Sequence, residues 1–156
     1  MDRREIIAAE LETQARDAIA FFESLPEDTL GRQVYSDGAQ WTVRQVLAHL
    51  ITIERSMHVL FRNILAGGTG GSEHFDVDRF NRTQPRKLDG LTPGELIERF
   101  RAVRAETIAI VRGMREEDLD RPGVHPYHGQ GTLARFVRWA YEHARIHESD
   151  IRGVTS

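Results

Sequence analysis

The sequence predicts an all-α protein, a four-helix bundle with long crossover connections between its helices. Apolar residues recur at steps of three and four in four separate stretches, which is the spacing of one helix face. Two of these stretches open with helix-capping residues, and the connections between the stretches are polar and long. No internal repeat, linker or low-complexity tract divides the 156 residues, so we expect residues 1–156 to form a single domain.

The first two helices are marked by their ends and by their apolar stripes. Residues 3–24 carry an apolar stripe that stops before Pro26, which cannot continue a helix. The second helix follows Thr42, a favourable N-cap, and Gln45 lies where it completes a capping box. The apolar stripe of this second helix has one polar member near its start and runs through Val46, His49, Leu50, Ile53, Met57, Leu60, Phe61 and Ile64.

The third and fourth helices follow the same logic. The third opens with Thr92-Pro93-Gly94-Glu95, which supplies an N-cap, a proline in the first turn and a glutamate at the third position. The fourth begins near Thr132. On its inward face two histidines continue a stripe that apolar residues begin, in the order Leu133, Phe136, Ala140, His143, His147 and Ile151.

Three connections join these helices. Residues 26–40 are polar, and a short extended piece is expected around residues 33–35. Residues 67–91 form a longer connection than compact domains usually have, which favours a functional loop or an extra element. We expect a short helix there, at about residues 76–84. Residues 115–131 are expected to wrap across one end of the bundle.

Composition excludes several classes of protein. The chain has no cysteine, so it contains no disulfide framework, thiolate zinc finger or cysteine nucleophile, and any metal must be held by nitrogen and oxygen. The 21 basic and 24 acidic residues give no large field of one sign, which argues against a nucleic-acid surface. No stretch approaches the roughly 20 apolar residues of a membrane span, and the N-terminus lacks the apolar run of a signal peptide. A cytoplasmic protein that binds no nucleic acid and no membrane is expected.

The candidate functional residues are three histidines on inward faces of two helices. His143 and His147 lie on the same side of their helix, because four residues turn a helix by about 400°. His49 lies inside the apolar stripe of the second helix. Three imidazole ligands suit a divalent metal ion, zinc first, with nickel or iron as alternatives. Such a set leaves one coordination position open, as in catalytic sites.

Each histidine also has a purely structural interpretation, because a buried imidazole needs only a hydrogen-bond partner. His58 lies on the side of its helix opposite His49 and is interpreted as a surface residue. The histidines of the predicted loops, at positions 74, 125 and 128, are assigned to solvent by default. His125 and His128 are at the same time candidates for a fourth ligand that would close the site, whereas Glu54 and Glu142 point away from it.

Taken together, several motifs resemble those of the DinB/YfiT-like superfamily. They appear in the same order and spacing over nearly the whole chain: Trp41-Thr42-Val43, His49-Leu50, the segment Phe75 to Asn81, Leu91-Thr92-Pro93-x-Glu95 and His143-x-x-x-His147. The resemblance implies an up-down-down-up bundle with a divalent metal ion on His49, His143 and His147. It also implies a homodimer, and activity as a transferase or isomerase that uses mycothiol, bacillithiol or glutathione.

We therefore expect a divalent-metal-dependent enzyme that activates a low-molecular-weight thiol for attack on a small electrophilic substrate. Asn81 and Arg82 are candidate substrate-binding residues, Arg82 because a guanidinium suits a carboxylate. Two alternatives stay open. One is a metal-dependent hydrolase that uses metal-bound water, and the other is a metal-binding bundle without catalysis, serving in stress response, sequestration or protein interaction.

Overall fold

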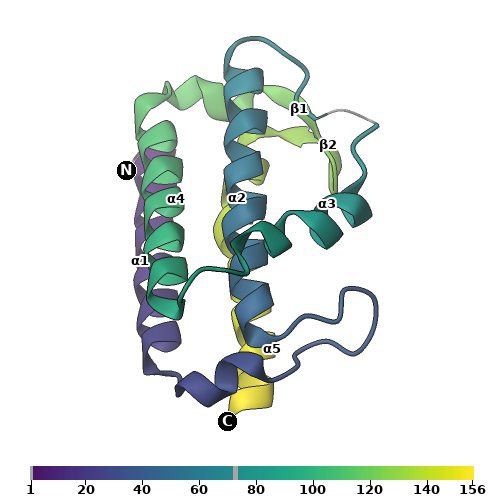
Figure 1. Cartoon of the computed structure of the whole chain (residues 1–156). Helices are drawn as coiled ribbons and strands as arrows, with labels where there is room; N and C mark the ends of the chain where they lie inside the picture. Colours follow the sequence, from purple (N-terminus) through teal and green to yellow (C-terminus); the bar gives the residue numbers. More distant parts are fainter. Residues whose placement is uncertain (1, 72–73) are drawn as a thin grey trace.

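The computed structural model describes residues 2–71 and 74–156, and over these residues it has four long helices (Figure 1). They are α1 (Arg3–Ser24), α2 (Val43–Leu65), α4 (Pro93–Gly113) and α5 (Leu133–Thr155). Helices α4 and α5 each pack against both α1 and α2, so the bundle closes around one interior. The predicted four-helix bundle is confirmed.

The direction of the helices explains the long connections. Helices α2 and α4 run parallel to each other and opposite to α1 and α5, which is the up-down-down-up arrangement (Figure 1). A connection between two parallel helices must return along the whole bundle. Here the return contains the short helix α3 (Val77–Thr83) and the 3-10 helix η2 (Pro85–Leu88), which packs on α2. The predicted short helix is present, with Asp76 as its N-cap.

The connection between α1 and α2 contains the 3-10 helix η1 (Glu27–Gly31) and then an extended piece. Gln33 forms an isolated antiparallel bridge with Thr42, so the predicted extended segment is found. The capping box at the start of α2 is also present, since the Thr42 amide donates to Gln45 Oε1 at 2.9 Å and the Gln45 amide to Thr42 Oγ1 at 3.4 Å. Both features lie close to the three histidines.

The connection between α4 and α5 holds an element that the sequence did not predict. After the 3-10 helix η3 (Glu116–Asp120), strands β1 (Pro122–His125) and β2 (Gly129–Thr132) form an antiparallel hairpin with Pro122 opposite Thr132. Strands this short and this rich in glycine and proline give no β signal. The hairpin is held by the 67–71 loop, where Gly70 has a φ of 99° and a Cβ would lie 2.7 Å from the Val124 carbonyl oxygen.

A layer of buried polar side chains lies between two apolar clusters of the bundle interior. Arg104 of α4 is 1% exposed and uses all five of its N–H donors. The acceptors come from the three other long helices, at 2.6–3.3 Å: both carboxylate oxygens of Glu54, the side chain of Gln14, and the carbonyl oxygens of Leu11 and Ala140. Glu54 is thus held by Arg104, and it does not point at the histidines, as predicted.

His58 belongs to this polar layer, and its assignment to the surface was wrong. It is 2% exposed, with Nε2 2.7 Å from Thr107 Oγ1 and Nδ1 3.4 Å from Glu106. His58 does lie on the face of α2 opposite His49, as the helical rotation predicts. That face is covered because α2 lies between α4 and α5, so both of its sides are buried. Separately, none of the helices over the described residues has the length and apolar character that a membrane crossing requires.

Candidate metal centre

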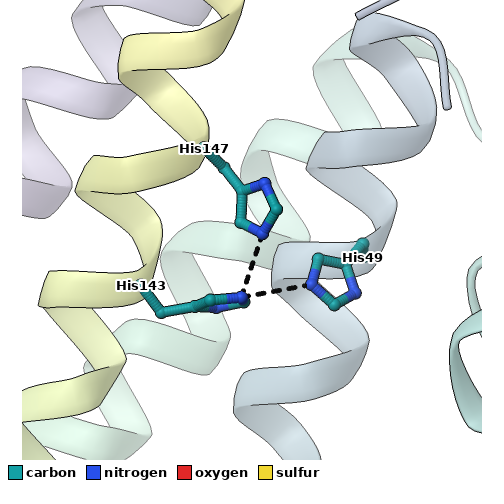
Figure 2. A group of neighbouring side chains, drawn as sticks. All are labelled: His49, His143 and His147. Atoms are coloured by element: carbon teal, nitrogen blue, oxygen red, sulfur yellow. Dashed lines mark hydrogen bonds between the residues drawn. The ribbon is translucent and has the colours of Figure 1, made fainter. Parts of the chain in front are cut away.

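The bundle brings His49, His143 and His147 together (Figure 2). His49 comes from α2, and the other two lie one turn apart on the facing side of α5. One ring nitrogen of each residue lies within 4.8 Å of those of the other two, and among the described residues this is the one group of three or more potential ligands so close together. The three histidines predicted as metal ligands are therefore close together in the structure.

The spacing of the nitrogens fits a common cation. His143 Nε2 lies 3.4 Å from His49 Nε2 and 2.9 Å from His147 Nε2. Two ligands of a tetrahedral zinc ion, each about 2.0–2.1 Å from the metal, would lie about 3.3 Å apart. A proton on His143 Nε2 can be donated to only one of its two neighbours, which leaves the lone pair of the other neighbour without a donor. A cation among the three nitrogens would satisfy all of them at once.

The protonation of His147 is fixed by two residues outside this group. The Tyr35 hydroxyl lies 2.7 Å from His147 Nδ1 and donates its single proton to Asp150 Oδ2, also at 2.7 Å. Nδ1 of His147 must therefore carry the proton and donate it to Tyr35, so Nε2 presents a lone pair to the other histidines. A second hydrogen bond of this kind is typical of metal-binding histidines. Burial and the Asp150 carboxylate raise the pKa of Tyr35, so its hydroxyl keeps its proton.

Two tryptophans hold the other rings. Trp41 stacks on His49 with ring centroids 4.4 Å apart and an interplanar angle of 29°. Trp139 of α5 lies 5.2 Å from His143, at 35°. His49 Nδ1 is buried without a hydrogen-bond partner among the described residues, so packing rather than hydrogen bonding orients this ring. The rings of His49 and His143 are thus oriented by aromatic packing.

The electrostatic environment keeps the three rings neutral, which is the form that binds metal ions. Burial, together with the two neighbouring histidines, holds the pKa of His49 well below its usual value. Burial and the nearby His147, His125 and His128 lower the pKa of His143 to about 3. Burial also lowers the pKa of His147, against the opposing effect of Asp150. At neutral pH all three offer lone pairs.

A mostly apolar cavity of about 680 Å³ opens onto the three histidines. Its wall is formed by α2, α5, the hairpin and the 67–91 connection, and contains Trp41, Ile53, Met57, Leu60, Phe75, Val77, Trp139 and Ile146 among others. Several apolar side chains at its rim are exposed, among them Val59 and Tyr127, at 71% and 70%. This is the lining expected for a small molecule with a substantial apolar body.

The predicted substrate-binding residues have different positions. Asn81 lines the cavity, and its Oδ1 is buried without a partner among the residues described. Arg82 instead lines a neighbouring polar pocket of about 860 Å³, which shares Trp41 and Asn81 with the apolar one. Asn81 thus lies in the wall of both pockets, whereas Arg82 and Tyr35 line the polar pocket alone.

The loop histidines were assigned to solvent, and for His125 this was wrong. It is 6% exposed and lines the apolar cavity, because the unpredicted hairpin folds its ring inward against Phe136. His128 is partly buried and contacts Trp139. Neither is a member of the group of three. Glu142 is exposed, as expected. Tyr35, Asp150 and Trp139 were not singled out by the sequence, which carries no local signal for them.

The helical bundle and the three-histidine cluster define a class of small metal-binding bundle proteins. A family model described as DinB superfamily matches residues 10–151, and the chain belongs to this superfamily. A solved structure, YfiT from Bacillus subtilis, is similar in fold, with a TM-score of 0.79 and 18% identity over 97% of this chain and 85% of that chain. That protein is described as a probable metal-dependent hydrolase with an unusual four-helix bundle topology. The comparison with curated proteins found no match.

Proposed function

We propose that this protein is a divalent-metal-dependent enzyme, a transferase or isomerase that activates a low-molecular-weight thiol for attack on an apolar electrophile. The observation that carries the proposal is the meeting of three neutral imidazoles at the wall of a mostly apolar cavity. His49, His143 and His147 would hold the ion, with zinc as the first candidate and nickel or iron as alternatives. A divalent ion held there would supply the positive charge that deprotonates a thiol at neutral pH.

Other residues around the three histidines have separate roles in this proposal. Tyr35 and Asp150 hold His147 with its Nε2 lone pair facing the other two rings. The apolar wall excludes water from the electrophile, and Asn81 orients the substrate between the two pockets. Arg82 provides a cation in the polar pocket for a carboxylate of the thiol. The thiol sulfur forms the new bond to the electrophilic carbon. In the same step that carbon loses a leaving group with its bonding electrons, or an activated double bond to it opens and takes up the electron pair. The proton of the thiol passes to solvent.

A second candidate is hydrolysis, in which water takes the place of the thiol. The similar fold of a protein described as a probable metal-dependent hydrolase favours this alternative. The alternative without catalysis was expected to show a fourth protein ligand that closes the site. Within the described part of the chain, neither His125 nor His128 joins the three histidines.

The first experiment is elemental analysis of protein purified without a metal-affinity tag. About one divalent ion per chain is expected in the wild type and in the control His128→Gln, and none in His143→Ala. The loaded protein is then assayed with a chromogenic aryl electrophile, with and without mycothiol, bacillithiol or glutathione, and in parallel with aryl esters.

Turnover that rises with thiol concentration and is lost in His143→Ala supports thiol transfer. Ester cleavage without thiol supports the hydrolase instead. A loaded protein without either activity would refute the proposal of an enzyme for these substrates. Light scattering on the same sample tests the homodimer, which we also propose on the basis of the family resemblance.

A further inference from the structure

A fourth histidine in the cavity wall has a fixed protonation that bears on its role. His125 ends strand β1 and is 6% exposed, and its ring lines the same cavity as His49 and His143. The His125 ring contacts the rings of Phe136 and His128, at centroid distances of 5.1 and 4.9 Å. It therefore lies apart from the three clustered histidines, although it is near enough to contribute to the lowered pKa of His143.

Backbone hydrogen bonds decide which nitrogen of His125 carries the proton. Nδ1 lies 3.0 Å from the amide nitrogen of Tyr127 and 3.2 Å from that of His128. A backbone amide can only donate, so Nδ1 must accept and cannot carry a proton itself. Burial, with the neighbouring His128, lowers the pKa of His125 to about 4, so the ring is neutral at pH 7. The single proton of a neutral ring must then be on Nε2.

The Nε2–H group of His125 has no hydrogen-bond partner among the described residues. Two other polar side chains of the cavity wall are engaged by nearby backbone groups: Ser56 donates to the Ile53 carbonyl oxygen, and Asn63 accepts from the Gly70 amide. Asn81 Oδ1 also lacks a partner among the described residues, but it is an acceptor and not a donor. A donor in a cavity wall that has no protein partner is available to an acceptor atom of a bound ligand. The hairpin thus offers a donor at a fixed position of an otherwise mostly apolar wall.

We propose that His125 donates its Nε2–H to an acceptor oxygen of the substrate, and that it is not a fourth metal ligand. The proposal rests on the proposed function and narrows its substrate class to electrophiles that carry a carbonyl or similar oxygen. A nitrogen that holds its proton offers no lone pair to a metal ion. A donor that is already in place stabilises the negative charge that grows on such an oxygen during attack on the neighbouring carbon.

The variant His125→Asn isolates this donor. An asparagine side chain can still accept at the Nδ1 position from the two backbone amides, but it does not reach the position of Nε2. The matched control is His128→Asn, on the same hairpin, whose ring does not line the cavity. The ligand probe is benzoate, which combines an apolar ring with acceptor oxygens, measured by calorimetry on both the zinc-loaded and the metal-free protein.

Three readouts test the proposal. Nitrogen NMR of the imidazoles should show His125 as the Nε2–H tautomer, in a resonance that is missing from His125→Asn. Zinc content should stay at about one ion per chain in both variants. Benzoate affinity should fall about tenfold in His125→Asn, which is the usual size of one hydrogen bond to a charged group, and should not change in His128→Asn.

Each opposite result overturns the proposal. A proton on Nδ1 would contradict the donor assignment, and loss of zinc from His125→Asn would make this residue a ligand. Unchanged benzoate affinity in a variant that keeps its zinc would show that the donor contacts no acceptor. If the wild type binds no metal, the proposed function fails, while the tautomer and benzoate binding to metal-free protein still test His125 by themselves.

Discussion

Removing the Tyr35 hydroxyl should weaken metal binding without touching a ligand. In Tyr35→Phe, His147 Nδ1–H loses an acceptor at 2.7 Å, and with it the link to the Asp150 carboxylate. Loss of such an outer hydrogen bond typically lowers metal affinity by about 10- to 100-fold. Because Asp150 is exposed and Tyr35 only half-buried, solvent replaces part of the interaction, and we expect the lower end, about tenfold.

The affinity is measured at pH 7 by competition with a chromophoric chelator, using zinc. Tyr127→Phe is the matched control, since Tyr127 lies at the rim of the same cavity and makes no hydrogen bond to the three histidines. Asp150→Asn should give a smaller loss than Tyr35→Phe, because an amide oxygen still accepts from the hydroxyl but carries no charge. A Tyr35→Phe affinity within twofold of the wild type would refute the assigned role of this hydroxyl.

Three further predictions concern stability. Zinc at 100 times its Kd should stabilise the protein by about 2.7 kcal/mol and raise Tm by about 5–10 °C, and calorimetry should show no such shift in His143→Ala. The folded-state pKa of His125, about 4, lies below the unfolded value of about 6.5, so the neutral folded ring is disfavoured as pH falls through this window. Urea titrations should show the wild type losing up to about 3 kcal/mol relative to His125→Asn between pH 6.5 and 4. Arg104→Met should cost about 3–5 kcal/mol in the same titration, because it leaves the Glu54 carboxylate buried without its partner, and a cost below 1 kcal/mol would contradict this.

Local chemistry explains why the helices could be predicted. The capping boxes at Thr42 and Thr92 are read directly from residues three apart, and both are present in the structure. The pairing of His143 with His147 follows in the same way from one helical turn. The position of His49 beside this pair cannot be predicted in this way, because it depends on how α2 packs against α5. The order of the helix directions came from the family resemblance rather than from periodicity.

What the sequence could not show depends on contacts between distant segments. Tyr35 contacts His147 across 112 residues of sequence. The connection that carries Tyr35 is held by the bridge between Gln33 and Thr42 and by backbone hydrogen bonds to the Trp41 carbonyl oxygen. His125 is buried by a hairpin whose strands carry almost no apolar alternation. In both cases the residue lies in a polar connection that the sequence assigns to the surface, and tertiary packing places it beside the site.

The polar layer around Arg104 also bears on the geometry of the metal centre. Apolar contacts tolerate small sliding of one helix along another. Each of the five hydrogen bonds of Arg104, in contrast, requires its acceptor at a particular position along the bundle axis. Glu54 lies five residues after His49 on α2, and Ala140 three residues before His143 on α5. The register that Arg104 imposes on α2 and α5 is therefore the register that sets His49 opposite His143.

If the hydrogen bonds of Arg104 set the register of the histidines, a variant can regain stability without regaining zinc affinity. Replacing a buried ion pair by apolar side chains of similar size is often neutral or stabilising, so Glu54→Leu combined with Arg104→Met should recover most of the stability lost in Arg104→Met alone. Without the hydrogen bonds that fix the register, the three nitrogens should be held less closely and zinc affinity should stay below that of the wild type. A double variant that recovers both stability and affinity would show that apolar packing alone sets the geometry of the site.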